Sequence, residues 1–130
     1  MFGKKNKDDC IRILTDTTKT AFVVHQEGKI VYSNKALSLI TGYSNDELLQ
    51  SISFWDIVHP EFSKLVKQRI LAKQKGEHVP SPFEIRIQCK DGSDRWLALS
   101  AELIAWKGKP AVLLSAPDIS QHKRDMKAIA

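Results

Sequence analysis

The sequence predicts an α+β domain, a five-stranded antiparallel sheet with helices packed on one face. Three observations lead to this class. Two short apolar runs flank a glycine-containing turn near the start of the chain, and a block of short helical patterns fills the middle. Three strand-like segments joined by tight turns follow, and strands joined by hairpins run antiparallel. The 130 residues fit a single domain.

The first half is predicted to contain one hairpin and several short helices. Asn34 suits an N-cap because its side chain accepts hydrogen bonds from the first helical N–H groups, and Gly42 suits the left-handed position that ends a helix. Ser44 and Glu47 have capping-box spacing, and Pro60 suits the first position of the longest helix. The expected elements are strands over 21–25 and 30–32 and helices over 10–18, 35–41, 44–49, 54–58 and 60–75.

The last third changes to the period of β-structure. From Phe83 to Lys90 apolar and polar residues alternate without exception, which indicates a half-buried strand with Cys89 facing inward. The Asp91-Gly92 pair indicates the hairpin that follows. Further strands are expected over 95–106 and 111–115, and 118–130 is expected to begin a helix that needs a partner.

The composition excludes several classes of protein. Apolar residues make up 42% and charged residues 27%, so the chain is not disordered as a whole. The two cysteines form no CxxC pair, so neither a disulfide scaffold nor a cysteine zinc site is expected. Neither a signal peptide nor an apolar run of about 20 residues is present, so we expect a cytoplasmic protein without a membrane partner.

Neither catalysis nor nucleic-acid binding is expected. No phosphate-binding glycine loop, zinc-protease motif or nucleophile elbow occurs, so any catalysis is expected in an attached output domain. The net charge of +5 lies at both ends and on the outer face of the long helix, where no aromatic residues are interleaved. We therefore expect a solvated helix face. Its basic residues are Lys64, Lys67, Arg69, Lys73 and Lys75.

Several local strings occur in a characteristic order. They are GKIVYSNKA at 28–36, TGYS at 41–44 with Glu47-Leu48, VHP at 58–60, KDGS at 90–93 with Arg95-Trp96, and DIS at 118–120. Together they resemble the PAS (sensory-box) family over roughly residues 11–122. The resemblance implies a sensor or signal-transfer module of a bacterial regulatory protein, with residues 1–10 as a polar segment, 11–120 as the sensor domain and 121–130 as the start of a signalling helix or linker.

The resemblance also implies partners and a route for the signal. An attached or partner output domain, such as a histidine kinase or a cyclic-dinucleotide enzyme, is expected. Asp118 and Ile119 fall where the family connects its last strand to the output helix, so they are the candidates for signal transfer. A homodimer is expected, because apolar residues in both flanking segments need to be buried. These residues are Ile11, Ile13, Leu14, Ile119, Met126 and Ile129.

The ligand or cofactor is unknown from the sequence. Candidate pocket-lining residues are Phe54, Trp55, Ile57, Leu65, Ile70, Ile85, Leu97 and Leu99. Two alternatives stay open. Either these residues enclose a small ligand or cofactor that the domain senses, or they fill the core of a ligand-free module for protein–protein interaction.

Specific cofactors are less well supported. Covalent flavin photochemistry needs a cysteine just before the longest helix, and the segment 51–55 has none. Cys89 is expected to behave as a small apolar residue. In haem-binding relatives an axial histidine comes from or just after the long helix, which makes His78, and less so His59, the haem candidates, although both suit a ligand-free role better. His25 and His122 have no second ligand at metal spacing, so no metal site is expected.

Overall fold

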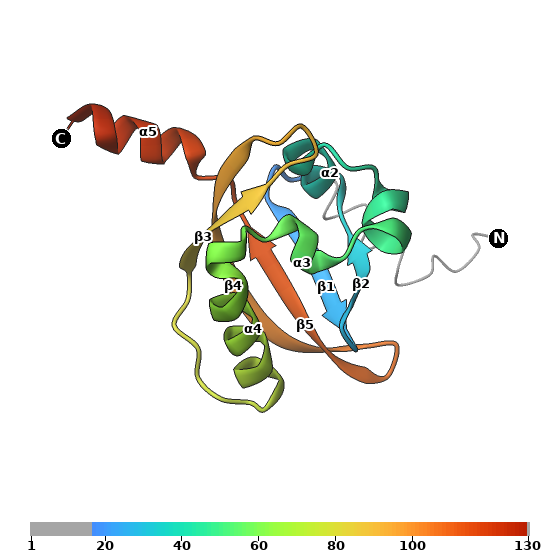
Figure 1. The fold of residues 1–130 in the computed structure, drawn as a ribbon. Helices are drawn as coiled ribbons and strands as arrows, with labels where there is room; N and C mark the ends of the chain where they lie inside the picture. Colours follow the sequence, from blue (N-terminus) through green and yellow to red (C-terminus); the bar gives the residue numbers. More distant parts are fainter. Residues whose placement is uncertain (1–16, 130) are drawn as a thin grey trace.

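The computed structural model describes residues 17–129, and the side chains of residues 17–126. Its five strands form one antiparallel sheet in the order β2-β1-β5-β4-β3, so the first and last strands lie side by side at the centre (Figure 1). The predicted α+β class with a five-stranded antiparallel sheet is confirmed. The strands are β1 (Ala21–Gln26), β2 (Lys29–Ser33), β3 (Phe83–Gln88), β4 (Asp94–Trp106) and β5 (Lys109–Ala116).

The helices between β2 and β3 cover one face of the sheet. The main apolar core lies beneath them and combines residues of the helices, such as Leu37, Leu48 and Val66, with the inward-facing residues of the strands. The last helix instead projects away from the body of the domain (Figure 1). The helices are α2 (Lys35–Thr41), the π-helix η1 (Glu47–Ser51), α3 (Phe54–Ile57), α4 (Pro60–Gln74) and α5 (Ser120–Ile129). Most of the helix predicted over 10–18 falls outside the described residues.

The predicted caps position the helices. Asn34 Oδ1 accepts the Leu37 N–H at 3.3 Å, and Gly42 ends α2 at a φ of +82°. Ser44 and Glu47 form the expected capping box, but the turn that follows is a π-helix, because the Ile52 N–H bonds to the Glu47 carbonyl five residues back.

The long strand β4 holds the two halves of the sheet together. Its first half pairs with β3 and its second half, from Ser100, pairs with β5. The β3–β4 connection is longer than the Asp91-Gly92 pair alone suggested, because β3 ends at Gln88 and the Cys89 N–H bonds across the loop to the Ser93 carbonyl. β4 and β5 are the last two strands, and α5 follows β5 in the chain.

Candidate functional site

A small apolar cavity lies in the core between the sheet and the helices. Its volume is about 30 Å³, and every residue that lines it is apolar. This is room for about two water molecules at most, and a cavity with an apolar lining stays dry. Pockets for drug-sized ligands usually measure about 300–1,000 Å³, so this cavity is at most about a tenth of that size and has no room for a flavin or haem.

The structure brings together five of the eight residues predicted to line a pocket. Phe54, Ile57, Ile85, Leu97 and Leu99 line the cavity. The other three do not. Trp55 and Leu65 are half-buried, and Ile70 is buried elsewhere in the core. The lining residues that the sequence did not single out come mainly from the central strands and α2, and they are Ala21, Val23, Leu37, Val58, Ile87, Leu114 and Ala116.

The two histidines considered for haem have other surroundings. His78 is exposed in the loop after α4 and does not line the cavity. His59 is the N-cap of α4, where its Nδ1 accepts the Glu61 N–H at 3.1 Å, and its Nε2 lies 3.0 Å from Arg86 Nη2. Within residues 17–126, no three His, Cys, Asp or Glu side chains form a group that could hold a metal ion. The cavity and its lining therefore do not fit haem.

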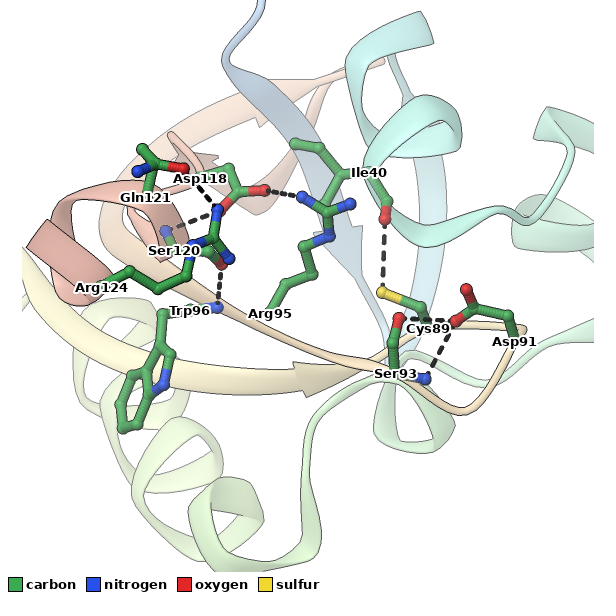
Figure 2. Close-up of polar contacts among 10 residues, drawn as sticks. All are labelled: Ile40, Cys89, Asp91, Ser93, Arg95, Trp96, Asp118, Ser120, Gln121 and Arg124. Atoms are coloured by element: carbon green, nitrogen blue, oxygen red, sulfur yellow. Dashed lines mark hydrogen bonds and ion pairs between the residues drawn. The ribbon is translucent and has the colours of Figure 1, made fainter.

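Cys89 is a buried free thiol, in agreement with the inward-facing position expected from the strand pattern. Its Sγ donates to the Ile40 carbonyl at 3.3 Å (Figure 2). Burial raises the pKa of the Cys89 thiol, which disfavours the reactive thiolate. These properties support a packing role for Cys89.

His25 has the most unusual polar environment in the core. Its side chain is 4% exposed, and neither ring nitrogen has a hydrogen-bond partner among the described residues. The ring centroid lies 5.4 Å from that of Phe54 and 6.3 Å from that of Trp55. Burial lowers the pKa of His25, because an apolar environment disfavours the charged imidazolium.

The start of α5 is joined to the first half of β4 (Figure 2). Asp118 accepts hydrogen bonds from Arg95 Nη1 at 3.1 Å and from the Ser120 N–H at 2.8 Å. Ser120, which is buried, accepts the Trp96 N–H on its Oγ at 2.9 Å. Asp118, which lies two residues before the start of α5, thus holds both a strand side chain and the N–H of the first helical residue.

Backbone and side-chain contacts extend this junction on both sides. The Ile119 N–H bonds to the Trp96 carbonyl at 2.8 Å, and the Ala98 N–H bonds to the Pro117 carbonyl at 3.1 Å. One turn into α5, Lys123 pairs with Glu84 of β3 at 2.6 Å and lies 4.4 Å from the centre of the Trp96 ring. The first turn of α5 is therefore fixed to β3 and β4.

The apolar residues predicted to support dimerisation are only partly described. Ile119 is half-buried at the junction, and Met126 is 56% exposed on α5. Ile11, Ile13 and Leu14 and the side chain of Ile129 lie outside the described residues. Dimerisation through these positions stays a prediction.

Comparison with known proteins identifies the family. The sequence profile described as the PAS fold matches residues 30–116, from the second residue of β2 to the end of β5. The chain belongs to the PAS family. The resemblance inferred from the sequence motifs is therefore confirmed. The match does not include β1, and hence His25, or the junction at Asp118.

Individual relatives agree with this PAS assignment. Sporulation kinase A of Bacillus subtilis (strain 168) is 29% identical over 111 residues, which cover 85% of this chain and 18% of that protein. The chain thus spans less than a fifth of that relative's length. A PAS domain of Colwellia psychrerythraea superposes with a TM-score of 0.74 at 19% identity, covering 89% of this chain and 99% of that one. A sensory box histidine kinase/response regulator from Burkholderia thailandensis E264 superposes with a TM-score of 0.66 at 21% identity, covering 92% and 91%.

Sequence reasoning missed two features of this PAS domain. His25 appeared only as a histidine on a strand, and its isolation was not evident because Phe54 and Trp55 are almost 30 residues away in the chain. Arg95 was noted as part of a motif, but its pairing with Asp118 depends on where β4 and the end of β5 meet.

No helix within the described residues is long and apolar enough to cross a membrane.

Proposed function

We propose that this PAS domain is the sensory input module of a signalling protein and controls a histidine-kinase output domain through α5. Membership of the PAS family and the similarity to part of a sporulation kinase support this proposal. The observation that carries it is the junction of Asp118 and Ser120 with β4. No catalytic role is assigned to the domain itself.

The junction provides a physical route for a signal. Consecutive residues of β4, Arg95 and Trp96, bond to Asp118 and Ser120 respectively. A displacement of the sheet at these positions changes the direction in which α5 leaves the domain. The residues beyond its first turn point away from the body (Figure 1), where an attached domain has access to them.

The packing of the core favours a module without a bulky cofactor. A cavity of about 30 Å³ has no room for a drug-sized ligand, and its apolar lining offers no polar group to orient one. An absorption spectrum of the purified protein, with mass spectrometry of the denatured sample, checks whether the domain holds a bulky cofactor. A stoichiometric chromophore or metabolite in either measurement would contradict it.

The coupling is tested in a chimera in which this chain replaces the matching 111-residue segment of sporulation kinase A. We expect autophosphorylation of the chimera, and Asp118→Ala should change its rate about fivefold or more, the usual lower range for coupling between sites. Asp125→Ala is the matched control, because Asp125 contacts Gln121 within α5 and not the sheet. An inactive chimera, or equal effects of the two substitutions, would contradict the proposal.

A further inference from the structure

The imidazole of His25 lies buried in the core of the domain. A neutral imidazole carries one N–H donor and one acceptor nitrogen. Both nitrogens of His25 are buried and have no partner among the described residues. Buried polar groups are nearly always hydrogen-bonded, so an unpaired group in a native core calls for an explanation.

The His25 ring lies between the sheet and α3. His25 follows a β-bulge in β1, between Ile30 of β2 and Val112 of β5 in the sheet register. The rings of Phe54 and Trp55 lie against it, and these are the first two residues of α3. α3 has only four residues, and a capping box between Ser53 and Asp56 closes it, so it forms a short cover over the ring.

The charged groups around this site do not neutralise an imidazolium. In the turn between β1 and β2, Glu27 pairs with Lys109 of β5 at 3.7 Å, and Lys29 of β2 is exposed. On the helices, Asp56 accepts the Ser53 N–H in its capping box, and Lys67 lies 5.6 Å from the centre of the Trp55 ring. Among the described residues no carboxylate bonds to His25, and Lys67, which lies over the Trp55 ring, has the same charge as a protonated imidazole.

We propose that His25 is the proton-binding group of this sensory module, and that its protonation displaces α3 from β1. This inference depends on the proposed sensory function only for its biological output. A solvent proton adds to the free ring nitrogen, and the imidazolium then has two N–H groups that require water or another acceptor. The rings of Phe54 and Trp55 provide no oxygen or nitrogen acceptor, so displacement of α3, which admits water, favours the protonated ring.

The size of the effect follows from linkage. When α3 is displaced the ring is hydrated, and its pKa is the ordinary value of about 6.5. Beneath α3 the pKa of His25 is lowered by burial. Over the interval between these two values, each unit of falling pH raises the ratio of open to closed states by up to about tenfold. Below the lower value the ratio becomes constant, because both states are then protonated.

Fluorine NMR of the whole chain labelled with 5-fluorotryptophan tests the proposal, from about pH 8 to about pH 5. The resonance of Trp55 should report the displacement. Trp106 is an internal control, because it belongs to a separate apolar cluster with Tyr32. His25→Phe and His25→Gln remove the titrating group, and His78→Gln removes an exposed histidine as the matched control.

We expect the Trp55 resonance to change as the pH falls below about 6.5, in the wild type and in His78→Gln but in neither His25 variant. A wild-type Trp55 resonance that is constant over this range overturns the proposal, whether or not the variants fold. A change that persists in a folded His25 variant also overturns it.

The experiment also separates this inference from the proposed function. Displacement of α3 that leaves kinase output unchanged in the chimera would sustain the proton site and contradict the sensory role. A kinase output that depends on Asp118 but not on His25, with a constant Trp55 resonance, would support the sensory role and overturn the proton site.

Discussion

Replacing Ser120 by alanine tests how firmly α5 is held to the sheet. The substitution removes the Oγ atom that accepts the Trp96 N–H at 2.9 Å, in a side chain that is only 7% exposed. A partly buried N–H that loses its acceptor costs about 1–3 kcal/mol. This free energy corresponds to about a 5- to 150-fold increase in the opening of the junction. The ten residues of α5 cannot compensate, because isolated helices of this length are marginally stable in water.

Amide hydrogen exchange measures this opening directly. In Ser120→Ala we expect faster exchange at Ile119 and Lys123, whose N–H groups bond to Trp96 and Ile119 respectively, and little change in the central strands β1 and β5. Ser120→Thr should restore slow exchange because it keeps the hydroxyl. Ser51→Ala, at an exposed position, is the control. Equal exchange in wild type and Ser120→Ala, or faster exchange throughout the sheet, would refute the reasoning that the hydroxyl holds the helix locally.

Three further predictions concern stability, measured by urea denaturation with an unchanged m-value. Ile85→Ala should cost about 2–5 kcal/mol and Ile85→Val about 0.5–1.5 kcal/mol, because Ile85 is 1% exposed beside the existing cavity; equal costs would contradict this. Gly42→Ala should cost about 1–2 kcal/mol from its φ of +82° alone, since an added Cβ meets only Lys90 Cβ at 3.5 Å. A neutral or stabilising result there would be inconsistent with the left-handed cap. Because the pKa of His25 is lowered in the fold, the unfolded chain binds more protons between that value and about 6.5, so stability should fall as the pH drops through this interval, and His25→Phe should reduce the slope.

Much of the fold could be predicted because its signals are local. Alternation in β3 requires only the period of two in a strand, and the caps at Asn34 and Gly42 act within one helical turn. The π-helical turn after Glu47 was not predictable, because the capping box specifies where a helix begins but not whether its bonds span four or five residues. The loop at Cys89 likewise extends beyond its Asp-Gly pair, because its backbone bonds to Thr41 as well as to Ser93.

The candidate site was predictable only in part. Apolar periodicity placed Ile85 and Leu97 in the interior, and both line the cavity. The same periodicity also included Leu65, which lies outside the lining, because a pattern of buried faces does not specify which buried residues meet one another.

The sequence by itself determined the order of the strands and the family, and it placed the last helix to within two residues of its start, because each depends on neighbours within a few residues or on recognisable strings. Only the tertiary structure decided that the cavity holds about 30 Å³, that Arg95 meets Asp118, and that His25 lies unpaired beneath α3. Those three properties depend on register and side-chain packing between segments that are distant in the chain. A sequence pattern specifies which side chains are buried, whereas the free volume and the hydrogen-bond partners of each depend on how the buried faces fit together.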